Sequence, residues 1–237
     1  MNSYFFTPQN ALPNDVGFTQ YGSAHLLWLV TIAAAVIAAA VVPVRYCRRT
    51  ADIGAWAALV LIILEKLMFA VQGALDIGQL PLHLCEMAPV LLVLFTFRRS
   101  DWLGQVLWTL CLPGSIAALL FPDWTMYPSC SAVSLQSFML HGLLILCPVL
   151  WLRDGLIRPD WRKLWKPWLF LAVVVPPIYL LNKLWHTNYF FVNAGSAGSP
   201  LELLIDKLGN PGFLVGYAAI ALGVMVIMDL PFLRKKA

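Results

Sequence analysis

The sequence predicts an all-α protein of the membrane, built as one polytopic bundle of seven transmembrane helices. Apolar residues make up 60% of the 237-residue chain and charged residues 12%, against about 45–50% and about 25% in soluble domains. Seven apolar segments have about the length that a helix needs to cross a hydrocarbon core of about 30 Å. They occupy so much of the chain that no soluble domain fits beside them. The composition also excludes a disordered chain and a nucleic-acid-binding domain.

Each of the seven spans is predicted from a continuous run of apolar residues. These runs lack the alternation of apolar and polar residues that a lipid-facing β-strand requires, so helices are predicted rather than a barrel. The third run is the shortest and contains Pro81 and Pro89, which predicts a tilted or broken helix. The predicted spans are residues 23–44, 53–73, 80–97, 102–120, 132–152, 167–185 and 211–230.

The basic residues predict the orientation of the bundle. Thirteen of the 16 lysines and arginines follow the first, third, fifth or seventh span, so they fall in alternate loops. Because positively charged loops are retained in the cytoplasm, the N-terminus is predicted outside and the C-terminus inside. The expected location is the cell membrane, as a multi-pass protein of the bacterial inner or plasma membrane.

Three segments flank or interrupt the spans. Residues 1–22 carry no lysine or arginine and no apolar core, so they predict an outer flap and not a cleavable signal peptide. Residues 23–231 form the membrane domain, and residues 232–237 form a basic cytoplasmic tail. Residues 193–210 are rich in glycine and serine and then mildly amphipathic, which predicts an outer loop with a short interfacial helix.

Ionisable groups inside a bilayer are costly and mark functional sites by default. In the predicted orientation they all lie in the outer half or near the midplane, which indicates a shared polar cavity that opens outward. The alternative is structural: Glu65 and Lys66 form an ion pair, Asn182 and Lys183 pin a helix end, and His25 and His186 are solvated at the interface. The polar residues of the spans are His25, Glu65, Lys66, Gln72, Asp76, His83, Cys85, Glu86, Ser134, Ser137, His141, Tyr179, Asn182, Lys183 and His186.

The five cysteines show no Cys-x-x-Cys spacing, so neither a disulfide framework nor a thiolate metal site is predicted. Cys130 lies in an outer loop and is the candidate partner of Cys85 for a structural disulfide. Otherwise Cys85, with its polar neighbours, is a candidate nucleophile. His83 would lie about 200° away around the helix, so the base must come from another span. His141 has a compatible depth. Cys47, Cys111 and Cys147 are interpreted as small apolar residues.

A family resemblance strengthens this assignment. The LPLHLC run at residues 80–85, His141 in a later span and Asn188-Tyr189 before the last span resemble the YwaF-like bacterial membrane proteins, which are similar to the transmembrane protein 164 family of animals. The resemblance implies a seven-helix fold and an acyltransferase that moves fatty acyl chains between phospholipids, with Cys85 as nucleophile and His141 as base. A more distant similarity to the androgen-induced lipid hydrolases, with their Thr/His pair, implies acyl-ester cleavage.

The favoured function is therefore a membrane acyltransferase or lipid ester hydrolase. His141 would take the thiol proton, and Cys85 would attack an ester carbonyl to form a thioester that a lysolipid or water resolves. The expected partner is a membrane phospholipid or lysolipid, without nucleic acid. No glycine-rich nucleotide loop is present, which argues against an ATP-driven step. No cofactor is expected. The residues assigned to substrate binding or orientation are Glu65, Lys66, His83, Glu86, Asn182, Lys183, Asn188 and Tyr189.

Two other functions compete with it. A transporter or substrate-binding subunit would use the charges of Glu65, Lys66 and Lys183 in an outward pocket. A metal site would combine the four histidines with Glu86, but no ligand pair shows the spacing typical of such sites. No bound metal is therefore predicted.

Overall fold

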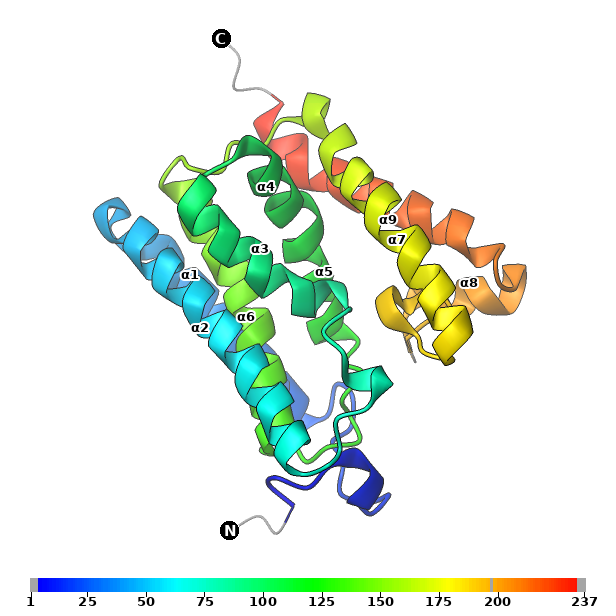
Figure 1. The fold of residues 1–237 in the computed structure, drawn as a ribbon. Coiled ribbons are helices and arrows are strands. Elements are labelled where there is room, and N and C mark those ends of the chain that lie inside the picture. The colour runs from blue at the N-terminus through cyan, green and yellow to red at the C-terminus, as the bar shows by residue number, and fades with distance from the viewer. Residues whose placement is uncertain (1–3, 197, 234–237) are drawn as a thin grey trace.

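The computed structural model describes residues 4–196 and 198–233, which contain helices and no strand (Figure 1). This confirms the all-α prediction. A π-helical segment, Leu107–Cys111, joins α4 to α5, so these form one continuous helix. The α-helices are α1 (Ser23–Val41), α2 (Val44–Val71), α3 (Leu84–Arg98), α4 (Asp101–Val106), α5 (Leu112–Leu120), α6 (Ala132–Arg153), α7 (Trp165–Trp185), α8 (Pro200–Leu208) and α9 (Phe213–Asp229).

Within the described part of the chain, five helical stretches are long and apolar enough to cross a membrane. An apolar stretch at Ser23–Ala39 is shorter, and α3 has only 15 residues. Each of the seven predicted spans overlaps a helix, and the predicted short helix within residues 193–210 is present as α8. The five stretches are Val44–Val71, Asp101–Leu120, Ala132–Arg153, Trp161–Trp185 and Phe213–Phe232.

Helix α2 begins nine residues before the predicted second span. It starts directly after Pro43 and carries Arg45, Arg48 and Arg49 in its first two turns. The prediction that these arginines lie in a loop is wrong. Arginine has a high helix propensity, so the helix continues beyond its apolar part towards the preceding proline.

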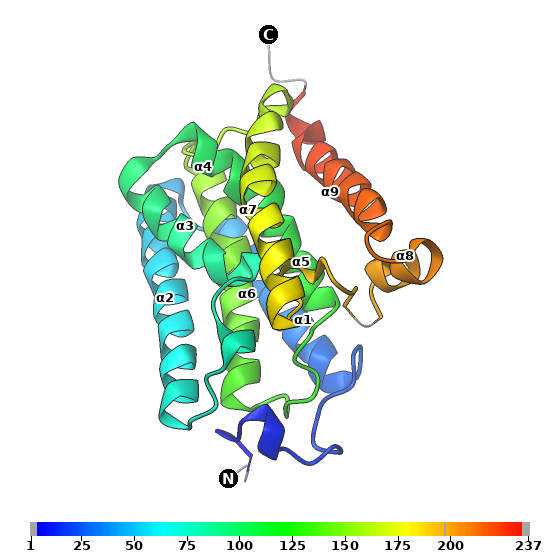
Figure 2. The same ribbon diagram turned by 45° about the vertical axis from the view of Figure 1, so that its right-hand side comes forward.

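Helix α3 has 15 residues, about half as many as the 28 of α2. The predicted span at residues 80–97 becomes helical only at Leu84, because Pro81 drives Leu80 into an extended conformation. Residues 72–83 run back along the bundle from the end of α2, so that α3 begins about halfway along its length (Figures 1 and 2). Asp76, which was predicted to be one of the polar residues of the spans, lies outside α2, because this helix ends at Val71.

Helix α6 forms the centre of the bundle and contacts α1, α2, α3 and α5. Its Phe138, Leu144 and Trp151 are fully buried. Against it α2 presents small residues, among which Ala55 is fully buried. A Cβ atom on Gly54 would lie 2.8 Å from the Cys147 sulfur. Small residues at a helix contact allow two helix backbones to approach closely, as is common where helices pack in membranes.

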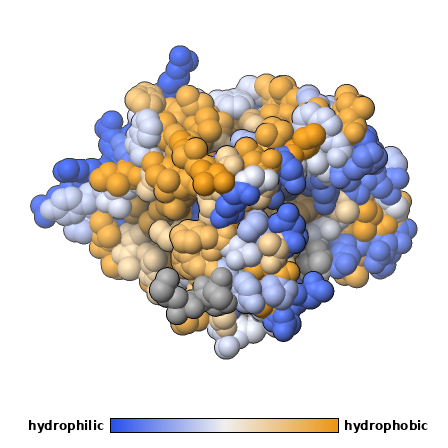
Figure 3. All heavy atoms as spheres, turned by 60° about the horizontal axis from the view of Figure 1, so that its bottom comes forward, coloured by the Kyte–Doolittle hydropathy of each residue, from blue (hydrophilic) through white to orange (hydrophobic). Residues whose placement is uncertain are grey.

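The N-terminal segment covers one end of the bundle. The Phe18 amide donates to the Thr125 carbonyl at 2.9 Å, and the Phe5 carbonyl accepts from the Ala132 amide at 2.9 Å. Figure 3 views this end and shows hydrophobic and hydrophilic residues side by side across it. Residues 1–3 of the predicted flap lie outside the described residues.

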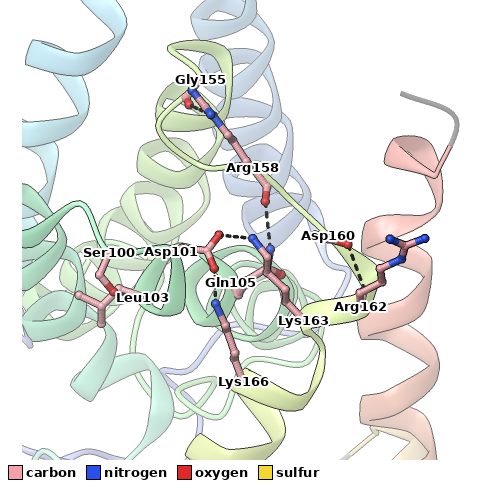
Figure 4. Close-up of polar contacts among 10 residues, drawn as sticks. All are labelled: Ser100, Asp101, Leu103, Gln105, Gly155, Arg158, Asp160, Arg162, Lys163 and Lys166. Carbon is pink, nitrogen blue, oxygen red and sulfur yellow. Dashed lines mark hydrogen bonds and ion pairs between the residues drawn. The ribbon is translucent and has the colours of Figure 1, made fainter. Parts of the chain in front are cut away.

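The α1–α2, α3–α4 and α6–α7 connections gather at the opposite end, where the arginines at the start of α2 also lie (Figure 1). There Asp101 accepts a hydrogen bond from Lys163 at 2.8 Å and another from Lys166 (Figure 4). The Gln105 amide donates to the Arg158 carbonyl at 3.0 Å. These contacts tie α4 to the segment before α7 and to the first turn of α7. Residues 234–237, which include most of the predicted basic tail, lie outside the described residues.

Candidate functional site

The candidate site is the N-terminus of α3. Glu86 accepts a hydrogen bond from the His83 backbone amide at 3.1 Å, which caps the helix. Cys85 is the second residue of the helix, partly buried and free. Cys130 is free as well, so the alternative of a disulfide between them is not formed. The first amides of a helix lack intrahelical acceptors and carry partial positive charge. A cysteine in this position is typical of reactive thiols.

A network of three charges links α3 to α2. The Lys66 ammonium lies 3.0 Å from a Glu65 oxygen and 2.6 Å from a Glu86 oxygen. The three side chains are 16%, 11% and 14% exposed, in the order Lys66, Glu65 and Glu86. Cys85 directly precedes Glu86 at the start of α3. The interpretation of Glu65 and Lys66 as an ion pair thus agrees with the structure, which adds Glu86 as a partner that their sequence spacing does not reveal.

His141 is buried in α6 with one ring nitrogen free. Its Nδ1 lies 2.7 Å from the Ser137 carbonyl oxygen. Because a carbonyl only accepts, this contact assigns the proton to Nδ1 and leaves a lone pair on Nε2. Nε2 is buried and has no hydrogen-bond partner in the described residues. The ring stacks on Trp124, with centroids 5.1 Å apart. A histidine held in one tautomer with Nε2 free has the arrangement of a general base.

The structure brings the helices of Cys85 and His141 into contact. Between residues 4 and 196 no hydrogen bond joins the Cys85 thiol to the His141 ring. Catalytic hydrogen bonds are commonly longer in an unliganded enzyme and tighten when substrate binds.

The third side of the site is the turn after α7. Asn182 is fully buried and donates to the Tyr189 carbonyl at 2.9 Å, while its oxygen accepts from the Tyr189 amide at 2.9 Å and the Thr187 hydroxyl at 2.8 Å. The Tyr189 ring packs edge-on to His83, with centroids 5.1 Å apart. Its hydroxyl donates to the Ile77 carbonyl, and burial raises the pKa of this hydroxyl. Asn182 therefore acts on the site indirectly, by positioning Tyr189.

Asn182 gives the first testable prediction. Replacing it with alanine should lower the free energy of unfolding by about 2–4 kcal/mol, because each buried polar group left unpaired costs about 1–3 kcal/mol. The control is Lys183→Ala, which removes the neighbouring, exposed side chain and should change stability by less than about 0.5 kcal/mol. Chemical denaturation in detergent measures both. Equal effects of the two substitutions would contradict the assigned role of Asn182.

Other predicted residues lie apart from this cluster or serve local structure. The Lys183 ammonium lies 5.0 Å from the Tyr179 ring centroid. The Asn188 oxygen accepts from the amides of Asn193 and Ala194, both at 3.0 Å, and so shapes its own loop.

The four predicted histidines are not gathered in one cavity. His25 is fully buried, with Nδ1 accepting from the Tyr21 amide and Nε2 donating to the Leu119 carbonyl, both at 2.8 Å. The prediction that His25 is solvated is therefore wrong, because both ring nitrogens are satisfied inside the protein. His186 is exposed at the end of α7. In the part of the chain that the structure describes, no group of three or more His, Cys, Asp or Glu residues is placed to hold a metal.

A groove between α2 and α3 adjoins the site, and sequence reasoning did not find it. Its volume is about 550 Å³, and its walls are mainly aliphatic, including Ile63, Leu67 and Val90. These three side chains are each about half exposed. Lys66 and Glu86 are the charged residues of the lining. The otherwise apolar groove therefore contains one ion pair, between Lys66 and Glu86. Glu86 follows Cys85 directly in the sequence.

A family model described as the TMEM164 family matches residues 20–229. This range extends from just before α1 to the last residue of α9 and includes both Cys85 and His141. No match was found among curated proteins or among solved structures.

Proposed function

Since the chain belongs to the TMEM164 family, we propose that it is a membrane acyltransferase or lipid ester hydrolase that acts on phospholipid acyl chains. The observation that carries the proposal is the pairing of two helices in contact: α3 presents Cys85 at its N-terminus, and α6 holds His141 with Nε2 unpartnered. The resemblance noted above implies the same two residues and the same roles.

The proposal includes a seven-span arrangement in the bacterial cell membrane, with the N-terminus outside and the C-terminus in the cytoplasm. Helix α3, with 15 residues, would cover about 22 Å of a hydrocarbon core of about 30 Å. The irregular segment 72–83 before it would lie at membrane depth, which is tolerated where the backbone packs against protein. Leu80, Leu82 and Leu84 do pack against the cluster around Tyr189. The gathering of most basic residues at one end of the bundle supports the orientation.

The proposed chemistry uses groups already in place. His141 Nε2 accepts the thiol proton as the Cys85 sulfur attacks the ester carbonyl carbon of a phospholipid. The carbon–oxygen bond breaks, the imidazolium returns the proton to the departing lysolipid oxygen, and the acyl group remains as a thioester. A lysolipid hydroxyl or water then attacks the thioester, again with His141 as base, and the thiol re-forms. The first amides of α3 and the Lys66 ammonium are suited to stabilise the oxyanion.

The groove between α2 and α3 supports a lipid substrate. An acyl chain lying against Ile63, Leu67 and Val90 would meet only aliphatic surface. Its ester group would then approach the charged pair Lys66 and Glu86, the second of which follows Cys85 directly in sequence. This arrangement brings the bond to be broken to the thiol without removing the chain from an apolar environment.

Intact-protein mass spectrometry after incubation with phospholipid tests the proposal. We expect a hydroxylamine-sensitive adduct with the mass of one acyl chain in the wild type and in Cys111→Ala, which replaces another buried cysteine. Cys85→Ala should lack the adduct. An adduct that persists in Cys85→Ala would contradict the assignment. So would its absence from all three proteins combined with wild-type lipid turnover in Cys85→Ala.

The charge network of Lys66 supports a second candidate, a transporter or substrate-binding subunit, because charges within spans commonly mark transport paths. Under this function, uptake of substrate into proteoliposomes would survive Cys85→Ala and fail on neutralisation of Glu65 and Lys66.

A further inference from the structure

A second concave site lies at the opposite end of α2 from Lys66. It has a volume of about 340 Å³ and is formed by the first turns of the helix. Measured along α2, its arginines lie about 26–32 Å from Lys66, so it is separate from the candidate site. Its lining consists of Arg45, Arg48, Arg49, Asp52, Ile53 and Trp56, and these residues are called the arginine pocket below.

The arginine pocket carries positive charge that the described protein does not neutralise. Arg45, Arg48 and Arg49 share one face of α2, and all three are exposed. Across residues 4–196 and 198–233 no carboxylate forms a salt bridge with any of them. Guanidinium groups held together in this way repel one another unless an anion lies between them.

The one acidic residue of the pocket is already engaged elsewhere. One Asp52 oxygen lies 2.5 Å from the Arg99 guanidinium, and the other accepts from the Trp151 indole at 2.9 Å. Both oxygens therefore bind groups outside the pocket lining. The charge of Asp52 is balanced by Arg99, which leaves the three arginines in excess.

The remainder of the pocket is apolar and exposed. Ile53 is 60% exposed and Trp56 46% exposed. Trp56 packs edge-on to Phe97 of α3, which is 69% exposed, with ring centroids 5.9 Å apart. Tryptophan is enriched where a membrane meets water. A small soluble anion would use the arginines and leave this apolar surface bare, whereas an amphiphile would use both.

We propose that the arginine pocket binds an anionic phospholipid of the leaflet at this end of the bundle. The guanidinium groups of Arg45, Arg48 and Arg49 bind the headgroup phosphate, for which their forked donors are suited. An acyl chain lies along Ile53, Trp56 and Phe97. The inference requires the membrane setting proposed above but not the chemistry at Cys85, so either can fail alone.

Native mass spectrometry of the full chain in detergent tests the site, with phosphatidylglycerol as the probe. The double variant Arg48→Gln/Arg49→Gln should bind this lipid about 30-fold more weakly, because each basic residue near an anionic lipid contributes about 1 kcal/mol. The matched control is Arg158→Gln/Arg162→Gln, which removes two charges from the same end of the bundle outside the pocket. It should bind as the wild type does. Arg48→Lys/Arg49→Lys, which keeps the charge but not the forked donors, should fall between them.

Three further results are decisive. Phosphatidylcholine should bind the wild type more weakly than phosphatidylglycerol; equal binding would overturn the proposal. Equal weakening in the Arg158/Arg162 control would show a diffuse basic surface and would also overturn it. Inorganic phosphate that displaces the lipid at equal concentration would show a soluble anion site in its place. Because the substituted side chains are exposed, the melting temperatures without added lipid should match, which separates lost binding from lost folding.

Discussion

Replacing His141 with glutamine is expected to lower kcat for phospholipid acyl transfer by about 10²–10⁴-fold, the contribution of a positioned general base. Nδ1 is committed to the Ser137 carbonyl, so Nε2 is the ring atom available to take the thiol proton. Since that proton moves only in the transition state, KM should change little. The measurement is transfer of a labelled acyl chain from phospholipid to lysolipid in liposomes.

The matched control for this experiment is His186→Asn. His186 is exposed and ends α7 with φ at 56°, a conformation that asparagine tolerates. We expect this variant to retain activity within about twofold, with an unchanged melting temperature. Equal rates for His141→Gln and the wild type would remove His141 from the mechanism, whatever the result at Cys85.

Replacing Lys66 with methionine should lower the free energy of unfolding by about 3–5 kcal/mol, because it leaves the carboxylates of Glu65 and Glu86 largely buried without their shared cation. The thermal or denaturant midpoint in detergent reports the loss. The informative comparison is the neutral triple variant Lys66→Met/Glu65→Gln/Glu86→Gln, which keeps the side-chain volumes and removes all three charges.

We expect the triple variant to recover most of the lost stability, since replacing an entire buried ion network by neutral groups of similar shape is often nearly neutral. In the Glu86→Gln side chain, the amide oxygen would still accept from the His83 backbone amide. A Lys66→Met protein within about 1 kcal/mol of the wild type would show that the network is solvated and structurally unimportant. In that case the oxyanion role proposed for Lys66 would also lose support.

The helices that the sequence predicted most closely are those bounded by sharp changes in polarity. The predicted spans 102–120 and 132–152 differ from the helical stretches Asp101–Leu120 and Ala132–Arg153 by one residue. Apolar patterning is local information, so it is legible in a single sequence. The start of α2 was missed because hydropathy indicates which residues lie in the apolar core of the membrane, not where a helix begins. The first turns of α2 are helical although they carry three arginines.

The candidate site was predicted in part. The high cost of ionisable groups within a membrane singled out Glu65, Lys66, His83 and Glu86 in the sequence. The structure does gather these residues at the start of α3. The partner that Lys66 takes on α3 depends on helix rotation and on the path of residues 72–83, and neither is encoded locally. For the same reason the burial of His25 between Tyr21 and Leu119 was not foreseen. The aliphatic groove was missed because its walls consist of ordinary apolar residues of two helices.

The sideways position of the groove between α2 and α3 has a kinetic consequence. Under the proposed function, a lipid that enters there would never cross into water, and so would avoid a cost of about 12 kcal/mol for a chain of about 16 carbons. Substrate encounter would then take place by diffusion in two dimensions, and the quantity that saturates the protein would be the mole fraction of substrate lipid in the bilayer. Adding inert lipid at constant substrate amount should slow the reaction by surface dilution, whereas diluting the whole liposome suspension should leave the rate per protein unchanged.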